Sequence, residues 1–409
     1  MNSLMKFNQK IRFNYYHQIG LLFALAPTVI HFNGANAWNV WPFACLFMIY
    51  FAIKLYGNQN VTRLANVVYQ NKLITGLFVI FLLSPYVGSL VITGALFETP
   101  LIVFESLFRL CFFFLMLLIG SSDKSSDVWK SYILFFSIVY IFFILAVLIN
   151  PSMKFTNSSG LCVVLGAIYF HYIFNKTFKF ILFIFTIFFL YDVMISRTLA
   201  VAYVVFHVYM EGEIYFKNYF KKWLIFLLAM VLLLTIFWFI RLDSISSEVG
   251  RLNSLTSGRG VIWSHYLSVM QETGSILFGV GHSREGFYSN IPSLYDGPMT
   301  IMKNVMVMGG VHNSFIYNFL TKGLVGMMAL FFFAHLLFKK HLKITNPINI
   351  GLFLVSALMM FTTGQSTIGG LTFESELMLM SLLIPFHKFY YSKKNCVIKN
   401  HKGSKINES

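Results

Sequence analysis

Long apolar runs separated by short polar connections cover most of the chain. A helix that crosses a membrane needs roughly 20 mostly apolar residues, and the runs are continuous rather than alternating like the strands of a membrane barrel. We therefore predict an all-α polytopic membrane protein with about twelve (11–12) transmembrane helices. The predicted spans are 18–33, 38–55, 73–93, 101–119, 131–149, 158–174, 179–195, 198–211, 223–240, 312–337, 347–364 and 372–390.

The composition agrees with this pattern. Of the 409 residues, 57% are apolar and only 11% are charged, whereas soluble domains carry about 25% charged residues. A soluble domain, a disordered chain and a secreted disulfide scaffold are therefore excluded. The four cysteines show no metal or redox spacing. We expect no cleavable signal peptide, because the first apolar run is not followed by a small-residue cleavage site.

The formal net charge of +16 is best explained by membrane topology. When the N-terminus is placed in the cytoplasm, most of the basic residues fall in cytoplasmic connections, as the positive-inside rule requires. Both termini are then cytoplasmic, and the lysine-rich segments would meet anionic lipid. Little of the charge remains to support a nucleic-acid partner.

One predicted connection is far longer than the others. We divide the chain into helices 1–9 (1–240), a large periplasmic loop with short amphipathic helices (241–311), helices 10–12 (312–390) and a basic cytoplasmic tail that we expect to be disordered (391–409). Long connections in compact proteins are usually functional. The basic residues of the loop are four arginines and one lysine, and arginine is the better bidentate ligand for phosphate.

Three motifs lie on the predicted periplasmic side. Thr256–Trp263 (TSGRGVIW) starts a helical pattern and carries Arg259, which could bind an anion or rest among lipid phosphates. Phe278–Arg284 (FGVGHSR) holds a Gly-x-Gly that fits a plain turn or a close approach to a ligand. Val311–Phe315 (VHNSF) places His312 and Asn313 where the loop re-enters the membrane, either as helix-capping polar residues or as a general base and a sugar-binding amide.

Three basic residues lie at or within predicted spans. Arg197 sits in a Ser-Arg-Thr turn at the outer face, where it either reaches lipid head groups or serves function. Arg109 and Lys322 are deeper, and we expect each to have a buried partner. Glu105, one helical turn before Arg109, is the obvious partner for that residue.

No metal or nucleotide motif accompanies these residues. The outer side has no Asp-x-Asp, no His-Glu-x-x-His and no cysteine pair, and the cytoplasmic side has no phosphate-binding loop. Glu374 and Glu376 are two residues apart and do not share a helix face. We therefore expect neither a metal nor a cofactor.

The order of the motifs resembles the O-antigen polymerase (Wzy type) and O-antigen ligase superfamily of Gram-negative bacteria. The resemblance rests on Ser-Arg-Thr, then Ser-Gly-Arg-x-x-x-Trp, Phe-Gly-x-Gly and His-Asn-Ser-Phe, with Lys-Gly-Leu-x-Gly below it; in motif it covers about 190–330. It implies a metal-independent, inverting glycosyltransferase of the GT-C kind in the inner membrane, with its active site facing the periplasm. The donor would be an oligosaccharide on undecaprenyl diphosphate.

The resemblance also implies roles for individual residues. By motif position, Arg197 and Arg259 match the arginines that bind the diphosphate, with Arg284 as a weaker third match, and His312 would deprotonate or orient the acceptor hydroxyl. Asn313, Tyr317 and Trp263 would line the sugar and acceptor site, and Glu374 or Glu376 is a reserve base.

Three functions remain open. A polymerase would use a second lipid-linked repeat unit as acceptor, and the resemblance implies a chain-length regulator as its partner. A ligase would use lipid A-core as acceptor. The Ser-Gly-Arg-x-x-x-Trp helix favours the polymerase. The third function is a lipid-linked-oligosaccharide flippase or other transporter. A transporter should show internal repeats and broken helices with polar sites at the midplane. The clustering of the motifs at one face favours the enzyme.

Overall fold

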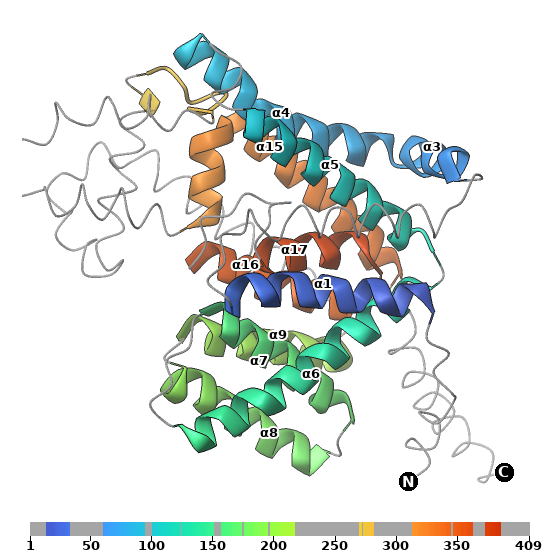
Figure 1. Cartoon of the computed structure of the whole chain (residues 1–409), viewed down its shortest axis with the longest axis vertical. Coiled ribbons are helices and arrows are strands. Elements are labelled where there is room, and N and C mark those ends of the chain that lie inside the picture. Colours follow the sequence, from blue (N-terminus) through green and yellow to red (C-terminus); the bar gives the residue numbers. More distant parts are fainter. Residues whose placement is uncertain are drawn as a thin grey trace, which may run out of the picture. The chain divides into compact units, whose positions relative to one another are not determined.

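The structure is a computed structural model, and it describes residues 14–32, 60–94, 100–122, 124–150, 157–173, 176–194, 197–216, 270–271, 273–281, 313–344, 347–362 and 373–385. Almost all of these residues are helical (Figure 1). The chain divides into two compact units. One unit comprises Met1–Leu64, Leu117–Arg197 and Ile384–Ser409, and the other comprises Ala65–Met116 and Thr198–Leu383. We call them unit 1 and unit 2.

Four described helices are long and apolar enough to cross a membrane. They comprise Lys72–Ile92, Ile102–Gly120, Ser125–Ile149 and Ser314–Lys339, and shorter apolar helices cover Thr198–Met210 and Ile348–Met360. Large apolar side chains such as Phe104 and Phe142 are exposed on them, which would be costly in water and is natural against lipid tails. The chain is therefore an all-α membrane protein.

In unit 1, helix α6 (Ser125–Ile149) packs between α1 (Tyr15–Phe32) and α7 (Asn157–Ile173). Glycines allow this close packing: a Cβ at Gly20 would strike the backbone of Val128, and one at Gly166 would strike Phe136. Helix α8 (Lys176–Phe188) follows and continues as a short π-helix, η3 (Phe189–Val193).

Unit 2 is built around α4 (Lys72–Thr93) and α15 (Ser314–Ile344), which lie side by side (Figure 1). Helix α5 (Pro100–Gly120) joins them through aromatic contacts, since the Phe78 ring lies 4.2 Å from that of Phe113 and 5.6 Å from that of Phe333. Helices α16 (Pro347–Thr362) and α17 (Phe373–Leu383) pack on each other and on α15. Helix α9 (Arg197–Phe216) reaches α16, where a Cβ at Gly351 would meet the Phe206 ring.

The predicted spans 38–55 and 223–240 lie outside the described residues, and each of the others overlaps a helix. The twelve-span count therefore stays a prediction. One helix, α3 (Asn60–Gln70), lies in a connection for which no span was predicted.

Two boundaries differ from the predicted ones for clear reasons. Helix α6 starts at Ser125 rather than at 131, because Lys130 Nζ bonds to Asp127 Oδ1 at 2.8 Å and so satisfies both charges within the first turns. Helix α17 ends at Leu383 rather than at 390. Pro385 follows, and the residue before a proline is disfavoured in helical conformation.

Candidate functional site

The residues predicted from motifs are only partly covered by the described structure. Arg259, Trp263, Arg284 and His312 lie outside the described residues. Arg197 is the first residue of α9, four positions after Val193, the last residue of the π-helix η3; its side chain is not described. π-Helical turns are frequent at functional sites.

Asn313 caps helix α15. Its side-chain Oδ1 accepts hydrogen bonds from the backbone N–H of Phe315 at 2.9 Å and of Ile316 at 3.1 Å. This is the usual geometry of a helix N-cap, one of the two roles that the sequence left open for this residue. The side chain is fully buried, and its Nδ2 has no hydrogen-bond partner among the described residues. That donor is the part of Asn313 that remains for a ligand.

Helix α15 is broken at Gly323, where the backbone adopts φ 63° and ψ −166°. The break leaves backbone groups on both sides without their helical partners, and the segment 276–281 supplies replacements. Val280 N–H donates to the Leu320 carbonyl at 2.8 Å and Gly281 N–H to that of Thr321 at 3.1 Å. In return, Leu324 N–H donates to the Ile276 carbonyl at 2.9 Å and Val325 N–H to that of Leu277 at 3.0 Å. Irregular backbone at membrane depth is tolerated where protein buries and satisfies it in this way.

Four glycines make this contact possible: Gly88, Gly279, Gly281 and Gly323, which we call the glycine junction. A Cβ at Gly279 would collide with the backbone at Leu320–Gly323, and one at Gly88 would collide with the carbonyls of Phe278 and Gly279. The last three also have positive φ angles, which side chains rarely adopt. The Phe-Gly-Val-Gly motif therefore brings its backbone close to α4 and α15. Of the two roles that the sequence left open, a plain turn or a close approach, the structure shows a close approach, and the group approached is protein backbone.

Apolar packing reinforces the junction. Met270, Val280, Ile316 and Leu320 form one buried cluster, and Ile92 and Tyr317 pack against it. This cluster and the four hydrogen bonds fix the described part of the predicted loop to α15.

A buried ionic pair lies in α5. Arg109 is 4% exposed, and its Nη2 bonds to Glu105 Oε1, the partner expected from the spacing of one helical turn. The pairing is incomplete, because Arg109 Nε is buried and has no hydrogen-bond partner among the described residues. Tyr86 and Tyr317 lie close enough to the Arg109 guanidinium to interact with its charge. Tyr86 also bonds to Ser106 Oγ at 2.6 Å, which ties α4 to α5.

Lys322 is fully buried immediately before the break in α15. We expected a buried partner for it. Among the described residues, Nζ has no hydrogen-bond partner and lies 4.5 Å from the centroid of the buried Phe81 ring. Phe81 belongs to α4, and α4 contacts α5 on both sides of Arg109, through Tyr86 with Ser106 and through Phe78 with Phe113, so Lys322 and Arg109 lie against the same stretch of α4. The cluster of Arg109, Glu105 and Lys322 thus holds two cations and one anion, and we call it the ionic cluster.

Only part of this arrangement could be predicted from the sequence. Tyr86 and Phe81 were not singled out, because an aromatic residue in an apolar span carries no signal of what it will face. Tyr317, a predicted acceptor-site residue, is half-buried beside the ionic cluster.

The reserve bases lie in α17. The side chain of Glu374 is not described, whereas Glu376 is 8% exposed and its Oε1 has no hydrogen-bond partner among the described residues. Within the described part of the chain, no three His, Cys, Asp or Glu side chains group as metal ligands.

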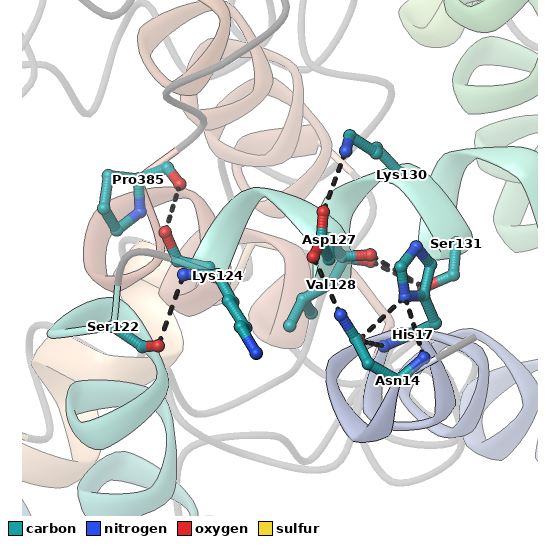
Figure 2. Close-up of polar contacts among 10 residues, drawn as sticks. Asn14, His17, Ser122, Lys124, Asp127, Val128, Lys130, Ser131 and Pro385 are labelled. Carbon is teal, nitrogen blue, oxygen red and sulfur yellow. Dashed lines mark hydrogen bonds and ion pairs between the residues drawn. The ribbon is translucent and has the colours of Figure 1, made fainter. Parts of the chain in front are cut away.

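Unit 1 has a polar network of its own (Figure 2). Asp127 accepts from Lys130 and from Asn14 Nδ2 at 3.0 Å, and Asn14 Oδ1 contacts His17 Nδ1 at 2.8 Å. On the neighbouring turn of α6, Ser125 Oγ donates to the Pro385 carbonyl at 3.0 Å. These bonds connect α6 to the start of α1 and to Pro385, two residues after α17, which is a structural role.

Comparison with known proteins gives no further guide, because no family model, no curated protein and no solved structure matches the chain.

Proposed function

We propose that the protein is a polytopic, metal-independent inverting glycosyltransferase that uses a glycan carried on a polyprenyl diphosphate. More specifically, we propose an O-antigen polymerase of the Wzy type, which joins undecaprenyl-diphosphate-linked repeat units at the periplasmic face of the bacterial inner membrane during lipopolysaccharide biosynthesis. In this proposal the chain has about twelve spans in a GT-C-like arrangement, and both termini are cytoplasmic.

The observation that carries the proposal is the hydrogen-bonded contact between the Phe278–Gly281 turn and α15. It joins two of the motifs on which the resemblance rests, and these motifs are about 40 residues apart in the chain. Arg284 follows Gly281 by three residues in the chain. His312 precedes the first residue of α15 by two. The junction would thus anchor both an arginine for the diphosphate and the histidine proposed as base.

The chemistry requires such anchoring. Cleavage of the anomeric C–O bond releases a diphosphate, on which negative charge builds as the acceptor hydroxyl attacks. Fixed cationic donors stabilise that charge most effectively when they are already in place, and Arg197, Arg259 and Arg284 are the proposed donors. His312 would take the proton of the acceptor hydroxyl. Asn313, through its unused Nδ2, would bind sugar together with Tyr317 and Trp263, and Glu374 or Glu376 is the reserve base.

One observation favours a second candidate, a lipid-linked-oligosaccharide flippase. Transporters place polar sites at broken helices near the middle of the membrane, and α15 is broken at Gly323 beside the buried Lys322. The ligase stays a third candidate, because it shares the donor chemistry of the polymerase.

A deletion strain separates the three functions on one gel of its lipopolysaccharide. Loss of a polymerase leaves lipid A-core that carries a single repeat unit. Loss of a ligase leaves bare core while lipid-linked polymer accumulates. Loss of a flippase also leaves bare core, but only single lipid-linked units accumulate. We expect the first pattern, restored to long chains by a plasmid copy, and either of the others would replace the polymerase proposal.

A further inference from the structure

The ionic cluster of unit 2 has positive charge in excess. Arg109 and Lys322 are both buried, and Glu105 is the one acidic group with which either of them pairs among the described residues. Glu105 neutralises one of the two cations. An uncompensated charge within a membrane protein is costly, and chains retain such residues mainly where function uses them.

The two cations also have unused hydrogen-bond donors. Arg109 Nη2 donates to Glu105, but its buried Nε has no hydrogen-bond partner among the described residues. Lys322 Nζ likewise has no acceptor there for any of its three N–H groups. Lys322 Nζ is covered only by the face of the Phe81 ring. A negatively charged hydrogen-bond acceptor would therefore satisfy both residues.

The cluster is not closed on all sides. The Glu105 side chain is 23% exposed, and Tyr317 beside Arg109 is half-buried. The neighbouring Phe104 and Leu107 on α5 are exposed apolar residues, 69% and 53%. The cluster is thus partly exposed at Glu105, next to apolar residues of α5 that are themselves exposed.

We infer that Arg109 and Lys322 form a binding site for a phosphate or diphosphate group, carried by a lipid or free in solution. The guanidinium and ammonium suit this ligand, because phosphate oxygens accept several charge-assisted hydrogen bonds at once. None of the three arginines proposed to hold the glycan donor takes part in this inference, and the site needs no glycosyltransferase activity to exist.

Binding to the full-length protein in detergent tests this inference. Thermal unfolding midpoints and calorimetric titrations are recorded with inorganic diphosphate, and separately with phosphatidic acid and with a polyprenyl phosphate added to the micelles. The variants are Lys322→Met, Arg109→Met and Arg109→Lys. The matched control is Lys339→Met, since Lys339 is an exposed lysine on the same helix.

We expect at least one phosphate probe to raise the unfolding midpoint of the wild-type protein. Lys322→Met should weaken that binding by about 10- to 100-fold, the usual worth of one hydrogen bond to a charged group, and Lys339→Met should not. A response to the lipids alone assigns a lipid head group, whereas a response to inorganic diphosphate assigns a free anion.

Lys322→Met is also expected to fold, so that a loss of binding cannot be ascribed to unfolding. Methionine fills a similar volume against Phe81 and removes an unpaired buried charge. Without any phosphate, this variant should unfold at the same temperature as the wild type or a higher one. Arg109→Lys, which keeps the charge, should retain part of the binding that Arg109→Met loses. If no probe binds, or if Lys322→Met binds as the wild type does, the phosphate site does not exist, whatever the outcome for the glycosyltransferase proposal.

Discussion

The backbone of Gly279 lies directly against that of Gly323, at the point where α15 leaves the helical conformation. Neither residue can carry a side chain there without a collision. The turn that contains Gly279 supplies hydrogen bonds that the broken helix has lost. Each of the two irregular segments therefore satisfies the other.

Substitution at this contact should be far more damaging than at a glycine with open space around it. Gly323→Ala places a methyl group against Gly279 and Leu277 at a positive φ, so we expect a loss of at least about 3 kcal/mol in unfolding free energy from the strain and the overpacking together. Gly76→Ala, in α4 with open space around the new methyl, should be neutral or stabilising by up to about 1 kcal/mol. Equilibrium unfolding in mixed micelles measures both; equal effects would contradict the junction.

We expect the effects of substitutions at Arg109 and Glu105 on the unfolding free energy to be coupled. Removal of one partner from a buried pair costs about 3–5 kcal/mol because the other charge is left uncompensated. Arg109→Leu should therefore destabilise the protein strongly, and Glu105→Leu in the same chain should recover much of the loss. A double-mutant cycle measures this coupling; strictly additive effects would show that the two groups do not interact.

Two substitutions at Asn313 separate its role as a helix cap from its proposed role in ligand binding. Asn313→Ala removes the cap and should cost about 0.5–2 kcal/mol. Asn313→Asp keeps a capping oxygen but replaces Nδ2, so it should restore stability without restoring polymer synthesis. The unfolding midpoint and the O-antigen ladder of each variant provide the two readouts. Full activity of Asn313→Asp would limit the role of Asn313 to capping.

The sequence predicted features that depend on local spacing. Glu105 and Arg109 are one helical turn apart, so their pairing follows from the helix alone. The break at Gly323 could not be predicted in the same way, because an isolated glycine in an apolar helix is normally tolerated. Its conformation depends on carbonyls and amides supplied from 276–281, about 40 residues earlier in the chain. The partner of Lys322 was missed for the same reason, since Phe81 comes from another helix.

The proposed catalytic residues can be tested in cells. Arg259→Ala and His312→Ala should abolish long O-antigen chains, because they remove a proposed diphosphate ligand and the proposed base; losses of 10²-fold or more are typical for such groups. Arg251→Ala, in the same predicted loop, and His335→Ala, on the exposed side of α15, should leave the ladder unchanged. All four variants must reach wild-type levels in the membrane. Normal chain length in Arg259→Ala and His312→Ala would remove these residues from the site.

In the function that we propose, this chain itself joins lipid-linked repeat units. The most direct measurement adds purified full-length protein to a synthetic repeat unit on undecaprenyl diphosphate, in detergent with EDTA, and separates the products by size. We predict a ladder of multiples of the repeat unit, with one undecaprenyl diphosphate released for each linkage formed. A ladder that appears only without EDTA would contradict the metal-free mechanism. Unchanged starting material under both conditions, from protein that restores O-antigen chains in the deletion strain, would contradict the polymerase assignment.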